Sequence, residues 1–295
     1  MAEPALAVHG GAGSLPTGDG GPYREALEAA LAAGWSALRS GGALDAVQAA
    51  VESLEDAPRF NAGRGSVLNA SGAVEMDAAI ASGPDRRAGA VAAIGRVRHP
   101  VRLAREVMEQ TPHVLLVGPA AERFALERDL ELMKPGWFVT PRERERLQRA
   151  LERRGDAEGG GGTVGAVARD AGGALAAATS TGGVRAQLPG RVGDSPLIGA
   201  GTYADGACAV SATGDGEAVI RAVAAHELAA LVRHAGLSLA EAAERTLREA
   251  IEPLGGAAGL IAIGPEGDPV MPFTTPAMHR GQRVGQAAPW VAIGP

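Results

Sequence analysis

The sequence lacks several features that define common classes of protein. Among its 295 residues Cys208 is the single cysteine, which excludes an internal disulfide and a cysteine-based zinc site and agrees with a reducing compartment. Cys208 stands in an apolar stretch, so we expect it to be a small packing residue. No stretch approaches the roughly 18 uninterrupted apolar residues of a membrane-spanning helix. We therefore expect no membrane partner.

A surplus of positive charge is also missing. The chain has 28 Lys and Arg against 34 Asp and Glu, for a net charge of -6, and its basic residues alternate with acidic ones, as in residues 141–154. Such a surface offers no uniform basic face to nucleic acid, so no nucleic-acid partner is expected. The first residues carry an acidic side chain and no basic region before a short apolar run, which differs from a secretory leader. The expected location is cytoplasmic.

The familiar sequence motifs of metalloproteases, nucleotide-binding proteins and serine hydrolases are incomplete or absent. The segment "HELAA" begins at His226 like the zinc motif H-E-x-x-H, but Ala230 stands where the second histidine is needed. The segment "GAGTYA" at 199–204 loosely matches a dinucleotide fingerprint, but no helix is expected after it, and no glycine-rich loop carries a Walker lysine. No G-x-S-x-G elbow occurs. Metalloprotease, nucleotide-binding and ordinary serine-hydrolase interpretations each lose a defining residue.

The residues that are present predict a globular protein with clustered strands and paired helices. At 295 residues, of which 46% are hydrophobic, the chain is long enough for one large core or for two domains. Apolar spacing predicts helices over 23–42, 43–56, 100–110, from 119, 216–236 and 238–255. It predicts strands over 4–11, 73–82, 89–97, 113–118 and 206–213, and hairpins over 163–183 and 259–273. Residues 129–162, in which a charged helix-forming segment runs into a glycine-rich one, are the expected linker.

This order of elements favours an α+β fold over a doubly wound parallel sheet. Strands gather in hairpins and helices in pairs, instead of alternating. Runs such as "GALAAATS" show little alternation of apolar and polar residues, which is typical of strands covered on both faces. We therefore expect two packed, mostly antiparallel sheets with helices on each outer side, a four-layer αββα sandwich.

The segment "EGGGGTVG" at 158–165 places a threonine directly after glycines. A threonine hydroxyl is a poor nucleophile without an adjacent base, and its own α-amino group, with a pKa of about 8, becomes available once the preceding peptide bond is cut. Glycines before Thr163 would let its hydroxyl reach the Gly162 carbonyl. Taken alone, the segment could equally be a linker that ends at a threonine.

Six segments occur together in one order along the chain. They are "HGGAGS", "FNAGRGSVLNASGAVEMDAAI", "GGTVGAVARD", "ATSTGG", "LPGRVGDSPLIGAGTYAD" and "VSATGDGEAVIR". With them the sequence resembles the plant-type (type 2) L-asparaginase/isoaspartyl peptidase family of N-terminal nucleophile (Ntn) hydrolases, over nearly the whole chain. The resemblance implies an αββα sandwich formed as one domain over 1–295, cut between Gly162 and Thr163 into an α chain (1–162) and a β chain (163–295), and a homodimer of αβ units.

The same resemblance implies roles for individual residues. These are Thr163 as cleavage site and nucleophile, Thr181 as the hydroxyl that orients it, Thr213 and Gly214 as the oxyanion hole, Asn61 near the catalytic centre, and Arg191, Asp194 and Gly216, together with Thr213 and Gly214, in substrate binding. An arginine can grip an α-carboxylate by two hydrogen bonds, and a carboxylate can pair with an α-ammonium. Without the resemblance, Arg191 and Asp194 would be assigned to a surface salt bridge.

The resemblance also implies a sodium site made of backbone carbonyls. Its expected donors are Leu54, Glu55, Ala57, Phe60, Ala62 and Arg64. Carbonyl ligands leave no side-chain signature, so the residues themselves could not reveal such an ion. No redox cofactor or catalytic metal is required. His9 in "HGGAGS" is expected to be a packed, hydrogen-bonded histidine and not a base.

The expected activity is hydrolysis of a side-chain amide. The substrate would be asparagine, or a β-aspartyl (isoaspartyl) dipeptide, and the products aspartate with ammonia or an amino acid. Glycosylasparaginase activity is the nearest alternative, and a non-catalytic amino-acid-binding protein is an alternative of another class. The tail 283–295 extends beyond the segment "MPFTTPAMHRG" that resembles the family's usual ending, and it is expected to be either an added surface strand or a flexible extension.

Overall fold

The computed structural model describes residues 2–14, 20–152 and 162–295, and its strands form two sheets. The larger sheet has the order β11-β10-β1-β5-β6-β2-β3-β4, and the smaller has the order β7-β8-β9. The larger sheet consists of β1 (Ala5–Gly13), β2 (Met76–Ser82), β3 (Ala88–Ile94), β4 (Leu115–Val117), β5 (Val164–Arg169), β6 (Leu175–Thr181), β10 (Ala277–Val284) and β11 (Trp290–Gly294). The smaller consists of β7 (Thr202–Ala204), β8 (Ala209–Gly214) and β9 (Ala258–Ile263). Neighbouring strands are antiparallel except for β3 and β4, which are parallel.

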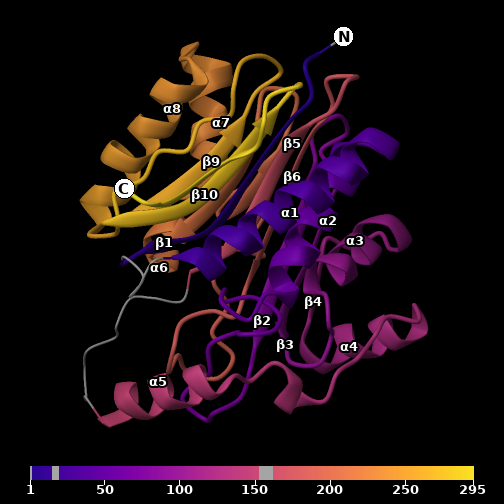
Figure 1. Cartoon of the computed structure of the whole chain (residues 1–295), viewed down its shortest axis with the longest axis vertical. Coiled ribbons are helices and arrows are strands. Elements are labelled where there is room, and N and C mark those ends of the chain that lie inside the picture. Colours follow the sequence, from indigo (N-terminus) through magenta and orange to yellow (C-terminus); the bar gives the residue numbers. More distant parts are fainter. Residues whose placement is uncertain (1, 15–19, 153–161) are drawn as a thin grey trace.

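Helices cover the outer face of each sheet (Figure 1). On the larger sheet these are α1 (Gly21–Ser40), α2 (Ala43–Asp56) and α3 (Pro100–Gln110), and on the smaller sheet α7 (Ala224–Ala235) and α8 (Leu239–Arg245). The other helices are α4 (Gly118–Glu127), α5 (Pro141–Glu152), α6 (Gly216–Ala222) and the short turns Pro135–Trp137, Thr246–Ile251 and Glu252–Leu254. The two sheets pack directly on each other, so the predicted four-layer α+β sandwich is confirmed.

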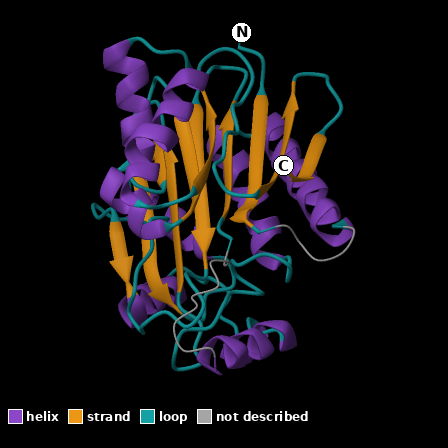
Figure 2. Ribbon diagram, turned by 90° about the vertical axis from the view of Figure 1, so that its left-hand side faces the viewer, coloured by secondary structure: helices purple, strands orange, loops and turns teal. Residues whose placement is uncertain are grey.

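Three apolar layers separate the four layers of secondary structure. One lies between the larger sheet and its helices, and another between the smaller sheet and α7 and α8. The layer between the sheets is rich in small residues, including Ala5, Ala7, Ala177 and Ala209, which lets the two sheets approach closely. Strand β6 is buried at every residue, as its unbroken apolar run predicts for a strand covered on both faces. Figure 2 shows the sheets with helices at either side.

One predicted helix differs from the structure. Within the expected linker, residues 129–162, the charged helix-forming segment contains helix α5 (Pro141–Glu152), whereas residues 153–161 lie outside the described residues. The helix predicted over 216–236 is two helices, α6 and α7, because Val223 between them has φ 49. A left-handed residue cannot continue a right-handed helix, and nothing in the local sequence marks a valine for that conformation.

The hairpins agree with the sequence to different degrees. Strands β5 and β6 are joined at Asp170, whose carbonyl oxygen accepts a hydrogen bond from Gly173 N at 2.9 Å, as predicted. In the last predicted hairpin the arm after β9 forms isolated bridges only, because Pro269 and Pro272 have no N–H to donate. The C-terminal tail is an edge strand, β11, paired with β10. Among the described residues no helix is long and apolar enough to cross a membrane.

Candidate active site

Glycines bring strand β1 against the residue that precedes Thr163. The pairing of β1 with β10 shifts between His9 and Ala12, which places a bulge at Gly10 and Gly11. Gly11 has φ 110, and a Cβ added to it would lie 2.5 Å from Gly162 Cα. Bulges are frequent beside functional sites because they redirect the chain. The close approach of Gly11 to Gly162 requires glycine at position 11.

Three threonines from three strands meet at this point. Thr163, at the start of β5, is 6% exposed, and its Oγ1 donates to Thr181 Oγ1 at 3.2 Å. Thr163 N donates to Thr213 Oγ1 at 3.3 Å. Thr181 lies on β6 beside β5, whereas Thr213 lies on β8 of the smaller sheet. The hydroxyl of Thr163 therefore has an orienting partner, and its nitrogen has a polar partner across the sandwich.

The Thr213 hydroxyl is arranged to donate a hydrogen bond. It is fully buried, and its oxygen accepts from Thr163 N and from Ala12 N, each at 3.3 Å. A hydroxyl has two acceptor lone pairs and one proton, so that proton remains for a third partner. Gly214 follows with φ 136, where a Cβ would lie 2.4 Å from Ala257 O. The end of β8 thus has a backbone shape that a side chain would prevent.

Asn61 supports the site from the side. Its Nδ2 donates to Gly183 O at 2.8 Å, and its Oδ1 accepts from Val67 N at 2.7 Å. Its backbone oxygen accepts from Gly182 N at 2.9 Å. These bonds fix the turn that follows Thr181. Among the described residues, the hydrogen bonds of the Asn61 side chain go to this turn and to Val67, not to Thr163.

Arg191, Asp194 and Gly216 are brought together, as the sequence predicted. A Cβ on Gly216 would lie 2.8 Å from Arg191 Nη2 and 2.9 Å from Asp194 Oδ1. Glycine at 216 therefore leaves room for both side chains to converge. Sequence reasoning missed Glu217, whose carboxylate accepts hydrogen bonds from Arg191 Nε and Nη2, each at 3.0 Å.

The buried carboxyl group of Asp194 has one oxygen that lacks a hydrogen-bond partner among the described residues. Asp194 is 5% exposed, and this oxygen is its Oδ2. Burial raises the pKa of Asp194 from 3.8 to about 7, while Arg191 opposes the rise. A cationic group from a ligand would relieve this cost.

A second buried carboxyl, Asp77, was also missed from the sequence. Its Oδ2 accepts from Gly193 N at 3.0 Å and its Oδ1 from Ala93 N at 2.9 Å, so it holds the loop that carries Asp194. Burial raises the pKa of Asp77 to about 6, with these backbone bonds opposing. A lone carboxylate in the apolar strand "MDAAIAS" was the available signal.

The six expected carbonyl donors belong to the last turn of helix α2 and to the loop 57–65 that follows it. Leu54 and Glu55 lie in its last turn, where carbonyl oxygens carry partial negative charge and no basic side chain occurs; Leu54 O accepts a hydrogen bond from Ala57 N at 3.2 Å. Glu55 O accepts from Arg64 N at 2.7 Å, which folds the 57–65 loop back on the helix end. Gly63, with φ 49, allows this because a Cβ there would lie 2.4 Å from Glu55 O. The donor chemistry fits a small hard cation such as sodium.

His9 and Cys208 have the environments expected of packed residues. Burial lowers the pKa of His9 to about 3, with a backbone hydrogen bond at Thr163 opposing, so the imidazole is neutral at physiological pH. Its Nε2 lies 2.8 Å from Ser211 Oγ. Cys208 is a free, buried thiol whose pKa burial raises to about 12. Neither group is suited to act as a base or nucleophile at neutral pH.

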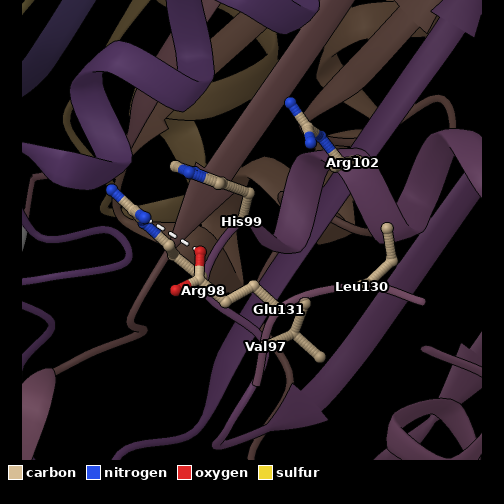
Figure 3. A pocket seen from close by; sticks show the side chains of 6 residues that line it. All are labelled: Val97, Arg98, His99, Arg102, Leu130 and Glu131. Atoms are coloured by element: carbon tan, nitrogen blue, oxygen red, sulfur yellow. Dashed lines mark hydrogen bonds and ion pairs between the residues drawn. The ribbon is translucent and has the colours of Figure 1, made fainter. Parts of the chain in front are cut away.

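A pocket of about 250 Å³ lies beside the end of helix α2, where its lining residue His99 is 3.3 Å from Glu55 (Figure 3). It is lined by Val97, Arg98, His99, Arg102, Leu130 and Glu131. Its arginines already have acidic partners, Arg98 with Glu131 at 2.8 Å and Arg102 with Glu52 at 2.7 Å. None of the predicted catalytic residues lines it, so we do not assign the reaction to this pocket.

The chain is similar to known proteins over nearly its whole length. A family model described as asparaginase matches residues 2–293. The chain is 47% identical to an isoaspartyl peptidase of Salmonella typhimurium, over 95% of each chain. It is 48% identical to an isoaspartyl peptidase of Escherichia coli, over 95% of this chain and 92% of that protein. It is 40% identical to a probable isoaspartyl peptidase/L-asparaginase of Arabidopsis thaliana, over 94% of each.

Proposed function

This chain belongs to the asparaginase family, and from that premise we propose that it is a self-cleaving threonine hydrolase acting on L-asparagine and on β-aspartyl dipeptides. One observation carries the proposal. Thr163 directly follows a glycine, its hydroxyl lies beside Thr181, and its nitrogen lies beside Thr213. Once the bond before it is cut, this nitrogen is an α-amine adjacent to its own nucleophile.

The proposed first event converts the chain to its active form. The Thr163 hydroxyl attacks the Gly162 carbonyl carbon, the Gly162–Thr163 C–N bond breaks, and the nitrogen takes a proton to become the free amine. Water then hydrolyses the resulting ester, which releases the Gly162 carboxylate and regenerates the hydroxyl. The products are an α chain of 1–162 and a β chain of 163–295. The Gly11 contact, which presses β1 against Gly162, supports this assignment.

In the proposed catalytic cycle, the Thr163 amine removes the proton from the Thr163 hydroxyl as the oxygen attacks the β-amide carbon. Thr181 orients that oxygen, and the unspent proton of Thr213, with the Gly214 N–H, receives the developing oxyanion. Such donors are commonly worth about 3 kcal/mol of barrier each. The amine then protonates the leaving nitrogen, and ammonia or an amino acid departs. Water hydrolyses the acyl-threonine and aspartate is released.

The proposed clamp selects substrates with free α-groups. Arg191 would bind the α-carboxylate and Asp194 the α-ammonium, with Gly216 leaving room between them. The unpartnered Asp194 Oδ2 and its raised pKa support a cationic ligand at that position. Asn61 acts by fixing the turn after Thr181.

Three further assignments complete the proposal. A sodium ion would be held by the carbonyl oxygens of Leu54, Glu55, Ala57, Phe60, Ala62 and Arg64, where it would stabilise the 57–65 loop that carries Asn61. The αβ units are proposed to form a homodimer, and the enzyme to be cytoplasmic. No redox cofactor or catalytic metal is included in the mechanism.

Denaturing mass spectrometry with kinetics tests the proposal. We expect fragments 1–162 and 163–295 from the wild-type chain, and hydrolysis of asparagine and of several β-aspartyl dipeptides. Thr163→Ala should remain one chain and be inactive, whereas Thr163→Ser, which keeps a hydroxyl, should still cleave. A wild-type chain that stays intact after long incubation, or cleaves at another bond, would refute it. Initial rates on the two substrate types determine which is preferred.

A further inference from the structure

A second row of residues lies directly beneath the three threonines. Gly165 stands two residues after Thr163, whereas Thr179 on β6 and Ser211 on β8 stand two residues before Thr181 and Thr213. His9 on β1 lies opposite Gly165 on β5. Gly165 is in turn opposite Thr179. Residues two apart in a strand face the same side of a sheet. This row therefore faces the space between the sheets, as the threonines do.

The second row is joined by short hydrogen bonds from one sheet to the other. Ser211 Oγ lies 2.8 Å from His9 Nε2 and 2.7 Å from Thr179 Oγ1. Thr202, opposite Ser211 on β7, has its Oγ1 2.6 Å from Thr179 Oγ1 and 2.9 Å from Ser195 O. All four side chains are fully buried. We call His9, Thr179, Thr202 and Ser211 the cross-sheet cluster.

Gly165 makes these contacts possible. A Cβ at this position would lie 2.1 Å from Ser211 Oγ and 2.4 Å from His9 Nε2. The side chains from the other strands therefore meet over a bare stretch of β5 backbone. The glycine stands two residues after Thr163, so the space for the cluster is created in the strand that carries the nucleophile.

The proposed reaction needs groups from both sheets at fixed separations. Thr163 and Thr181 belong to the larger sheet, and Thr213 belongs to the smaller one. The apolar contacts between the sheets involve many alanines, and apolar contact has no preferred direction. Hydrogen bonds require heavy-atom distances of about 2.5–3.2 Å and near-linear geometry. The cross-sheet cluster supplies such hydrogen bonds at Ser211, two residues before Thr213 on the same strand.

We infer that the cross-sheet cluster consists of positioning residues, which hold the smaller sheet in the register that places Thr213 against Thr163. This inference rests on the proposed function. Its two ends support different parts of the site. Ser211 is two residues from Thr213, whereas Thr202 contacts the carbonyl of Ser195, the residue after Asp194. The first end bears on bond cleavage and the second on substrate binding.

Two substitutions separate the ends. Ser211→Ala removes the hydroxyl that joins His9 to Thr179, and we expect kcat and the rate of self-cleavage to fall at least about tenfold, with KM nearly unchanged, because small misplacements of reacting groups are costly. Thr202→Val keeps the shape of the side chain but loses the bonds to Ser195 and to Thr179, while Ser211 still joins His9 to Thr179. We therefore expect KM to rise more than kcat falls. Thr202→Ser restores the hydroxyl and should restore KM.

Thr246→Val is the matched control. Thr246 is also a buried threonine, and its hydroxyl donates to Ala242 O at 2.8 Å in the helical layer outside the smaller sheet. The substitution removes a buried hydroxyl far from Thr163, so it should lower the melting temperature without separating kcat from KM. If Ser211→Ala does not fold, the pair Thr179→Val and Thr179→Ser asks the same question at the centre of the cluster.

The inference would be overturned if the Ser211→Ala variant cleaved itself and turned over substrate at wild-type rates. It would also be overturned if Thr202→Val changed KM and kcat in the same proportion as Thr246→Val does. A crystal structure of Ser211→Ala in which Thr213 keeps its hydrogen-bond distance to Thr163 would overturn it as well, and this readout needs no substrate. An inactive, intact wild-type chain would instead count against the proposed function. The two failures are therefore distinguishable.

Discussion

The raised pKa of Asp194 predicts how substrate recognition depends on pH. Burial places this pKa at about 7, so the unliganded carboxyl is partly protonated near neutral pH. Only its ionised form pairs strongly with an α-ammonium. For a pKa of 7, the ionised fraction falls from about three quarters at pH 7.5 to about 3% at pH 5.5, which is roughly 25-fold. Asparagine recognition should weaken by up to that factor over this range.

The Thr163 amine must also lose its proton, so a single pH profile cannot isolate Asp194. Succinamate, which is asparagine without the α-ammonium, supplies the comparison. Both substrates need a neutral Thr163 amine, but only asparagine can use the charge on Asp194. We therefore expect the ratio of kcat/KM for asparagine to kcat/KM for succinamate to fall as the pH falls from 7.5 to 5.5.

The substitution Asp194→Asn should make this ratio independent of pH and should lower it at pH 7.5. Equal pH dependence for asparagine and succinamate in the wild-type enzyme would refute the assignment of Asp194 to the ammonium. So would an Asp194→Asn enzyme whose ratio still follows the pH.

The same substitution has a calculable effect on stability. Because the folded-state pKa of Asp194 lies above its ordinary value of 3.8, ionisation opposes folding, and the cost grows as the pH rises from about 4 to 7. A rise of about three units in the pKa corresponds to about 4 kcal/mol in the free energy of unfolding. Unliganded Asp194→Asn should therefore have the higher melting temperature at pH 8, with the difference vanishing near pH 4. A less stable variant at pH 8 would contradict the calculation.

Other predictions concern the groups around Asp194. Gly216→Ala should raise KM at least about tenfold while self-cleavage at Thr163 continues, because the new methyl group displaces Arg191 and Asp194; mass spectrometry with kinetics measures both, and an unchanged KM would contradict it. Arg191→Ala should fold and self-cleave but lose affinity for substrates with a free α-carboxylate, whereas unchanged kinetics would refute the clamp. Glu217→Gln should lower KM up to about fivefold by freeing Arg191 from a competing carboxylate, and a raised KM would show instead that Glu217 holds the guanidinium in place.

The sequence was informative where local chemistry decides the structure. The Asp170 turn, the buried β6 strand and the glycine before Thr163 each follow from a few neighbouring residues. Such features require no knowledge of the distant chain. The joint role of Arg191 and Asp194 in substrate binding came instead from the resemblance carried by six segments along the chain.

Contacts between distant segments could not be predicted in this way. Glu143, 1% exposed on helix α5, pairs with the buried Arg185 at 3.1 Å, although its segment is charged enough to be interpreted as a linker. The meeting of Ser211 with His9 spans 202 positions of the chain. Val223 adopts its left-handed conformation between two helices with no local signal. Each depends on packing that forms only when the sheets and helices assemble.

The strand order of the larger sheet has a consequence for how the protein would refold after the proposed cut. Strand β1 belongs to the segment before Thr163, yet it lies between β10 and β5, which both follow Thr163. The two proposed fragments are therefore interleaved within one sheet and share its hydrogen bonds. After unfolding in denaturant, uncut Thr163→Ala can regain this sheet in a first-order process. The cut fragments must first find each other, so their recovery should slow on dilution, and the peptide link would matter most during the first folding of the chain.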